Sequence, residues 1–153
     1  MPIFISHSVA PWELALVNGV ADLASRQGAE PIILDRDWDP QSGVPQRIAR
    51  KITDANYIIA IASQFGRHLD WLNQELIYGQ KLSRPSLIVA DAGIQVVPGY
   101  NCIRIDRMNP SVTLTQVSQH IQDLVQDRQT RNLLTGLLIA GLALLFLSSL
   151  KGE

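Results

Sequence analysis

Residues 57–62 read Tyr-Ile-Ile-Ala-Ile-Ala, and this run is the strongest strand signal in the chain. A nearly continuous apolar run is typical of a strand that is covered on both faces, as in a parallel sheet. Four further runs surround it, at residues 3–5, 31–34, 87–90 and, more weakly, 102–105. The sequence therefore predicts five strands, and residues 57–62 form the third.

Segments with helical periodicity separate these strands. The first has apolar residues three or four positions apart from Trp12 to Leu23, and Gly28 is placed to end it. Alternating strands and helices are typical of a parallel α/β sheet. We therefore predict a flavodoxin-like, doubly wound, five-stranded sheet in the order 2-1-3-4-5. Ligands of such sheets bind beyond the carboxyl ends of the strands, here between the first and third strands.

Composition narrows the functional classes. The 153 residues fit one domain, and 13 Lys and Arg against 14 Asp and Glu give a net charge of −1. This balance argues against a nucleic-acid partner, because proteins that bind nucleic acids usually carry an excess of clustered Lys and Arg. One cysteine, Cys102, excludes an internal disulfide and a cysteine-based zinc site. We expect no metal site, because Asp35, Asp37 and Asp39 lack the later ligands of a calcium-binding loop.

Known phosphate and nucleophile motifs are missing from the sequence. It contains no GxGxxG, no GK[ST] and no GxSxG. Classical dinucleotide dehydrogenases, P-loop NTPases and serine hydrolases are therefore not supported.

The last part of the chain has a different composition. Residues 133–150 read LLTGLLIAGLALLFLSSL, without a charge or a proline. As a helix this segment reaches about 27 Å, close to the hydrocarbon thickness of a bilayer. We predict a domain at residues 1–128 and a transmembrane helix with a short tail at residues 129–153. The alternative is a hydrophobic helix buried in a soluble oligomer.

Small residues and flanking charges refine the membrane prediction. Gly136, Ala140 and Ala143 share one helix face, which favours close helix–helix packing in lipid. Arg128 and Arg131 precede the apolar segment. Their excess over the single following lysine favours a cytoplasmic domain on a single-pass protein of the bacterial inner membrane. No signal peptide is expected at the N-terminus.

Glu75 is the carboxylate best placed for chemistry. It follows Trp71 by four residues, so both side chains lie on one helix face near the predicted ligand edge. An aromatic neighbour can partly desolvate a carboxylate and pack against a substrate ring. The alternative is a surface glutamate beside a core tryptophan.

Several of these segments together resemble a bacterial TIR domain. They are PIFISHS at residues 2–8, the loop with Trp38 and Gly43, DANYII at residues 54–59 and WLNQE at residues 71–75. Their order and separations also match, and the resemblance covers residues 2–128. Many TIR domains hydrolyse or rearrange NAD⁺, and their catalytic glutamate occupies the place of Glu75.

The resemblance implies a site with NAD⁺ as substrate and no cofactor. Glu75 would be catalytic, and the substrate-binding residues would be Ser6, His7, Ser8, Trp38, Ser63 and Trp71. The nicotinamide ring of NAD⁺ carries a positive charge and departs from the ribose as a neutral molecule, so no general acid is needed. One carboxylate can stabilise the positive charge that develops on the ribose.

The resulting hypothesis is a membrane-anchored NAD⁺ glycohydrolase that acts in antiphage defence. It would form homo-oligomers through the TIR domain and the transmembrane helix, in contact with membrane lipid. A variant of this hypothesis yields a cyclic ADP-ribose isomer. Two alternatives are a non-catalytic TIR scaffold, in which Trp38 matters and Glu75 does not, and a nucleoside deoxyribosyltransferase-like enzyme.

Overall fold

Five parallel strands form one sheet in the order β2-β1-β3-β4-β5, which confirms the predicted topology. The computed structural model describes residues 1–96 and 98–150, with side chains through residue 132. Its strands are β1 (Pro2–Ser8), β2 (Glu30–Ile32), β3 (Tyr57–Ala62), β4 (Ser86–Ala90) and β5 (Asn101–Arg104). Its α-helices are α1 (Leu14–Arg26), α2 (Gln46–Asp54), α3 (Leu69–Lys81) and α4 (Pro110–Leu150), and two short 3₁₀ turns are η1 (Pro11–Glu13) and η2 (Pro40–Ser42).

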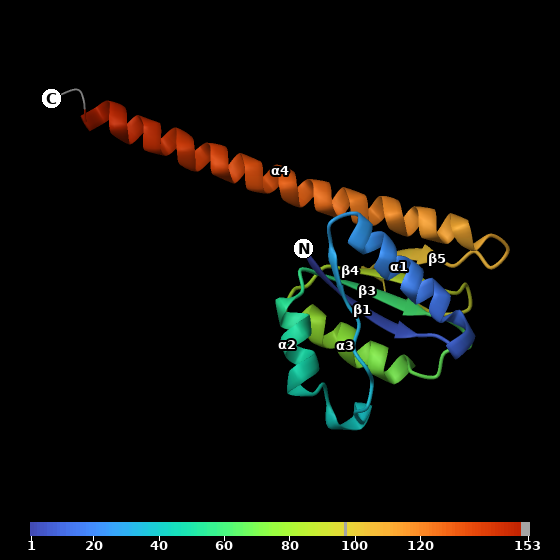
Figure 1. The fold of residues 1–153 in the computed structure, drawn as a ribbon. Coiled ribbons are helices and arrows are strands. Elements are labelled where there is room, and N and C mark those ends of the chain that lie inside the picture. Colours follow the sequence, from blue (N-terminus) through green and yellow to red (C-terminus); the bar gives the residue numbers. More distant parts are fainter. Residues whose placement is uncertain (97, 151–153) are drawn as a thin grey trace.

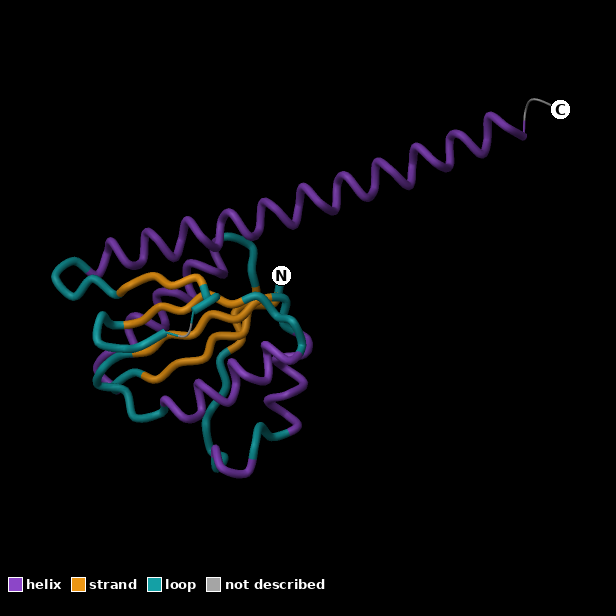
Figure 2. The backbone as a smooth tube through the Cα atoms, turned by 180° about the vertical axis from the view of Figure 1, so that it is seen from behind, coloured by secondary structure: helices purple, strands orange, loops and turns teal. Residues whose placement is uncertain are grey.

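The sheet lies between two helical layers. Helices α1 and α4 cover one face, and α2 and α3 cover the other (Figure 1). The view from behind shows the strands between these layers, with the η2 loop below the α2–α3 layer (Figure 2).

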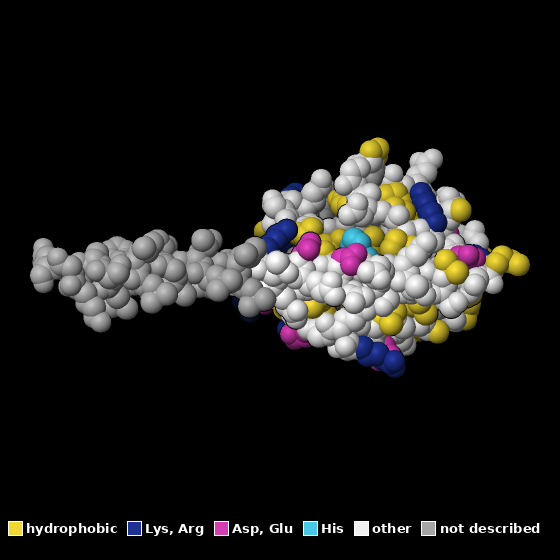
Figure 3. All heavy atoms as spheres, turned by 90° about the horizontal axis from the view of Figure 1, so that it is seen from above, with side chains coloured by type: hydrophobic (Ala, Val, Ile, Leu, Met, Phe, Trp, Pro, Cys, Tyr) yellow, Lys and Arg dark blue, Asp and Glu magenta, His cyan; other side chains and the backbone are white. Residues whose placement is uncertain are grey.

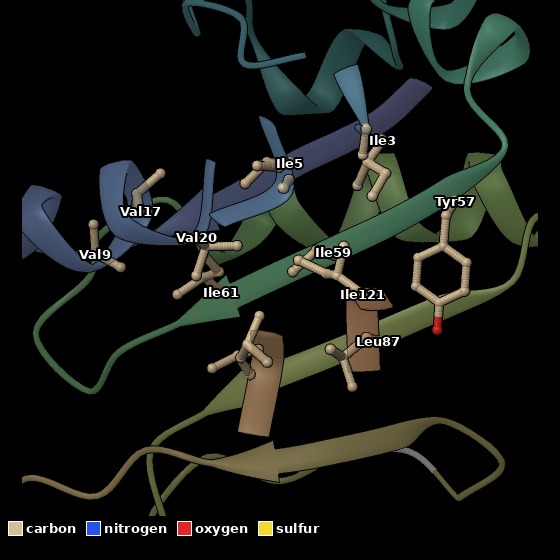
Figure 4. Close-up of a cluster of buried hydrophobic side chains, with 14 residues drawn as sticks. Ile3, Ile5, Val9, Val17, Val20, Tyr57, Ile59, Ile61, Leu87 and Ile121 are labelled. Carbon is tan, nitrogen blue, oxygen red and sulfur yellow. The ribbon is translucent and has the colours of Figure 1, made fainter. Parts of the chain in front are cut away.

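Alternation along β1 divides its side chains between the two layers. Ile3 and Ile5 pack with residues of α1 and α4, whereas Phe4 packs with residues of α2 and α3. Figure 4 shows the first of these clusters, including Tyr57 and Ile121. Because side chains alternate along a strand, Ser6 lies on the same face as Phe4 and is directed to α3.

Several predicted boundaries were shifted. Strand β2 ends at Ile32 and not at residue 34, and β5 covers residues 101–104 and not 102–105. The sequence also allows a short strand at residues 94–97, but residues 94–96 form none, and residue 97 lies outside the described residues. Asp70, whose residue type and position favour a helix N-cap, lies in the first turn of α3, and the N-cap position is His68.

Helix α4 continues through the predicted domain boundary after residue 128. The side chains of residues 133–150, including the predicted face of Gly136, Ala140 and Ala143, lie outside the described residues. Among the residues that are described, no helix has the length and apolar character that a membrane crossing requires. The membrane span stays a prediction.

Gly66 lets the loop after β3 pass close to the end of β1. A Cβ atom at Gly66 would lie 2.0 Å from the backbone oxygen of Ser8. Gly66→Ala is therefore expected to lower the free energy of unfolding by about 1–3 kcal/mol, because backbone must move. Gly93→Ala is the matched control, since nothing lies within 4 Å of its added Cβ. Equal urea midpoints for the two variants would contradict this prediction.

Candidate functional site

Glu75 lies on the buried face of α3. Leu72, Glu75, Leu76 and Gly79 follow the helical repeat and are all buried. An added Cβ at Gly79 would meet Ile58 of β3 at 2.1 Å, so glycine allows the helix to lie close to the sheet. Glu75 is only 2% exposed, and this excludes the alternative of a surface glutamate.

The carboxylate of Glu75 is enclosed by two side chains. Ser6 Oγ, from β1, donates a hydrogen bond to Glu75 Oε2. Arg36 Nη2 donates to the same oxygen at 3.0 Å and to Ser6 Oγ at 2.8 Å. The charged pair is buried on both sides, with side-chain exposures of 9% for Arg36 and 3% for Glu75.

Sequence reasoning missed Arg36. This residue follows β2 by four positions, and the loop that carries it returns across the sheet edge to α3. The strand order places the loop after β2 near the edge where ligands bind, and this was the only sequence signal that a residue of the loop could belong to the site. Nothing in the local sequence indicates which loop side chain reaches Glu75.

Two tryptophans attach the same loop to α3. Trp71 Nε1 donates to the backbone oxygen of Trp38 at 2.6 Å, and the two rings meet edge to face at 6.3 Å. Trp38 is 8% exposed. Trp38 fills the space under its own loop, and no partner subunit is needed to bury it.

His7 follows Ser6 in β1, so its side chain leaves the strand on the opposite face, that of Ile3 and Ile5. Burial, with help from the nearby charges of Arg36 and His68, lowers the pKa of His7 from 6.5 to about 4. Its Nδ1 is buried and has no hydrogen-bond partner among the described protein residues. His7 is therefore neutral near pH 7 and is not a proton donor to a leaving group at that pH.

The structure places Ser8 and Ser63 in other contacts. Ser8 Oγ accepts from the backbone N–H of His68 at 3.1 Å. Ser63 Oγ donates to Glu13 Oε2 and accepts from the N–H of Phe65 at 3.0 Å. Neither hydroxyl bonds to Glu75 within residues 1–96 and 98–132. The structure thus brings Ser6, Trp38 and Trp71 to the Glu75 region, whereas His7 lies on the other face of β1 and these two hydroxyls bond elsewhere.

Glu13 belongs to a second polar network at the carboxyl ends of the strands. Arg107 donates to Asp91 Oδ1 at 2.7 Å and to Glu13 Oε1 at 2.6 Å. Burial alone would raise the pKa of both carboxyls, but hydrogen bonds from Ser63 to Glu13 and from Arg107 to Asp91 lower each pKa below its usual value. This network holds the loops of β1, β3, β4 and β5 together.

Two grooves of the described residues lie away from Glu75. An open groove of about 960 Å³ runs between β5 and α4, and its lining includes His120 and Asp123. Figure 3 shows the face that carries α4, where acidic side chains lie beside a histidine. A smaller, apolar groove of about 350 Å³ lies between α3 and residues 94–100. Glu75 lines neither groove, and Arg36 covers its carboxylate.

The lowered pKa of His7 predicts a pH effect on stability. Between pH 6.5 and about 4 the unfolded chain protonates this histidine and the folded chain does not, so stability falls as pH falls through this window. Asp91 and Glu13 lose their stabilising charge only at lower pH, because each pKa is lowered. His7→Asn is expected to lose less stability than the wild type between pH 7 and pH 5, measured by urea unfolding.

His120 is the control for this measurement. Burial also lowers the pKa of His120, against an opposing effect of Asp123. The substitution His120→Asn therefore also removes part of the dependence of stability on pH. The His7 prediction therefore concerns the pH dependence of stability that remains in the His120→Asn variant. A slope there that is unchanged by His7→Asn contradicts it.

Comparison with known proteins supports the fold. No family model matches the sequence, and no curated protein matches it significantly. Among solved structures, a TIR domain of the RPS4 and RRS1 heterodimer has a TM-score of 0.59 at 11% identity, covering 80% of this chain and 97% of that one. A flavodoxin-like domain from Synechococcus has a TM-score of 0.57 at 13% identity, covering 84% and 99%.

A third similar structure is a CMP N-glycosidase from Clostridium botulinum. Its TM-score is 0.52 at 10% identity, and the match covers 76% of this chain and 98% of that one. At such low identities these similarities establish a TIR-like, flavodoxin-like fold and nothing beyond it.

Proposed function

We propose that this protein is a TIR-type NAD⁺ glycohydrolase that cleaves the nicotinamide–ribose bond, with Glu75 as its catalytic carboxylate. The observation that carries the proposal is the buried Glu75 at the carboxyl edge of the sheet, bonded to Ser6 of β1. Two similar folds, a TIR domain and an enzyme that acts on the N-glycosidic bond of a nucleotide, are consistent with it.

The proposed reaction needs one negative charge beside the ribose. The C1′–N bond breaks, and its electron pair passes to the pyridinium nitrogen, which leaves as neutral nicotinamide. The sugar gains oxocarbenium character, which a carboxylate in a poorly solvated site stabilises strongly. Water then adds to C1′ and releases a proton to solvent, giving ADP-ribose.

The residues around Glu75 favour a cationic leaving base over a neutral one. A neutral base such as cytosine leaves readily only after protonation, which requires an acid near its ring. The pyridinium of NAD⁺ leaves without an acid, and the side chains bonded to Glu75 are Ser6 and Arg36, neither of which gives up a proton readily at pH 7. The proposal therefore selects NAD⁺ over CMP, the substrate named for the similar glycosidase.

Parallel incubations with NAD⁺ and with CMP test the substrate. Chromatography measures nicotinamide and cytosine, and mass spectrometry separates ADP-ribose from a cyclic isomer. We expect nicotinamide release to exceed cytosine release by at least about tenfold, since only the pyridinium leaves without a proton. Cytosine release at an equal or greater rate overturns the choice of NAD⁺.

Self-assembly completes the proposal. The similar TIR domain occurs in a heterodimer, which supports pairing between TIR-like domains. Anchoring through residues 133–150 would concentrate copies in the membrane plane, close to lipid. The location in a bacterial inner membrane and the role in antiphage defence remain predictions from the sequence.

The enclosure of Glu75 favours a second candidate, a non-catalytic TIR scaffold. A carboxylate that only holds a loop in place needs no access to solvent, and Arg36 covers it. For a scaffold, opening this contact changes no reaction. For an enzyme, it exposes the catalytic group.

A further inference from the structure

We infer that residues 33–45 form a latch, in which Arg36 covers and neutralises Glu75 until the loop leaves α3. This inference concerns the regulation of the proposed catalytic site and rests on the proposed function. It reconciles a carboxylate suited to N-glycosidic chemistry with the enclosure that this structure shows.

Two contacts attach the latch to α3. Arg36 bonds to Glu75 and, through the same nitrogen, to Ser6. Trp38 accepts the hydrogen bond of Trp71, one helical turn before Glu75. Both contacts connect the loop to the same helix, so the loop covers Glu75 as one unit.

The latched site does not fit the proposed chemistry. Glu75 Oε2 already accepts hydrogen bonds from Ser6 and Arg36. The guanidinium charge cancels the field of the carboxylate, and a positive ribose intermediate beside Arg36 would be repelled. With Glu75 only 2% exposed, a ribose has no access to it.

When the latch opens, water can replace much of what its contacts with α3 contribute. Arg36 Nη1 and Trp38 Nε1 are buried without a hydrogen-bond partner among the described protein residues, and both belong to the loop. Opening hydrates these atoms and also the desolvated ion pair, which offsets much of the lost attraction. Gly43, with φ of 80°, lies near the end of the loop and provides a backbone conformation that other residues rarely adopt.

Arg36→Gln in the full chain tests the latch, and Arg47→Gln is the matched control. Arg47 pairs with Asp37 in the same loop, but both side chains are exposed and neither contacts Glu75. Carbodiimide labelling measures access to the Glu75 carboxyl, with exposed Glu30 as the internal reference. Hydroxyl-radical oxidation of Trp38 measures loop opening without depending on a titratable group.

We expect Arg36→Gln to raise Glu75 labelling and Trp38 oxidation by at least about tenfold, and Arg47→Gln to change neither, since a tenfold change needs only a modest shift in the opening equilibrium. If Arg36→Gln proves unstable, Arg36→Lys replaces it. Lysine keeps the charge but lacks the planar guanidinium fork, so labelling should rise less. Unchanged labelling and oxidation overturn the latch.

Nicotinamide release from NAD⁺ is measured on the same dilute samples. The latch predicts a rise of at least about tenfold for Arg36→Gln, parallel to the labelling, and no change for Arg47→Gln. A fall below the wild-type rate in an opened loop means that Arg36 serves the substrate, and it overturns the latch. If the loop opens and neither protein releases nicotinamide even when crowded, the proposed function fails and the latch stands.

Discussion

Glu75→Gln is expected to lower the rate of nicotinamide release by about 100- to 1,000-fold, the usual effect of removing one preorganised electrostatic group from a transition state. Glutamine has the size of glutamate and still accepts hydrogen bonds from Ser6 and Arg36. The substitution therefore removes the charge with little change in packing. The assay uses the full chain, dilute and then crowded with polyethylene glycol.

Glu30→Gln is the control for this loss. Glu30 begins β2 and is exposed at the amino end of the strands, opposite the candidate site. The same chemical change there is expected to leave the rate within about twofold of wild type, as surface substitutions usually perturb little. Equal rates for wild type and Glu75→Gln would remove Glu75 from the mechanism.

The Arg36–Glu75 pair is also expected to have a large effect on folding stability. Truncating either partner to alanine leaves the other charge without its partner until the loop opens to water, which lowers the free energy of unfolding by up to about 3–5 kcal/mol. The double variant removes both charges. It should therefore lose less stability than the sum of the two single variants, with a coupling energy of about 1–3 kcal/mol.

The exposed pair of Arg47 and Asp37 calibrates this double-mutant cycle. It joins the same loop to α2, but its side chains are 50% and 73% exposed. Water screens such a pair, so its coupling energy should be only about 0.2–1 kcal/mol. Urea unfolding of both sets of variants provides the comparison. A coupling energy for Arg36 and Glu75 no larger than that of the exposed pair would contradict the buried geometry.

The sheet was predictable because its signals are local. The apolar runs locate the strands, and parallel β/α alternation leaves few possible orders. The longest error is in β1, which extends to Ser8 and not to residue 5, and the other errors fall mainly on β2 and β5, which are edge strands with one neighbour each. Their ends depend on register: β2 pairs only with Pro2, Ile3 and Phe4, and its chain then turns into the latch.

The candidate site was predictable only in part. The spacing of Leu72, Glu75, Leu76 and Gly79 contained the signal that Glu75 is buried. Arg36 contacts Glu75 across 39 positions of sequence through an irregular loop, and no periodic pattern predicts the path of such a loop. The hydroxyls of Ser8 and Ser63 satisfy local backbone and carboxylate groups, and sequence alone does not distinguish such a serine from one that binds a ligand.

The most direct test of the central claim compares Arg36→Gln with Arg36→Gln/Glu75→Gln. In both proteins the guanidinium charge over residue 75 is removed, so they differ only in the charge of that side chain. We expect the single variant to release nicotinamide from NAD⁺ and the double variant to release about 100- to 1,000-fold less. Equal release by the two proteins would contradict the claim that the Glu75 carboxylate breaks this bond.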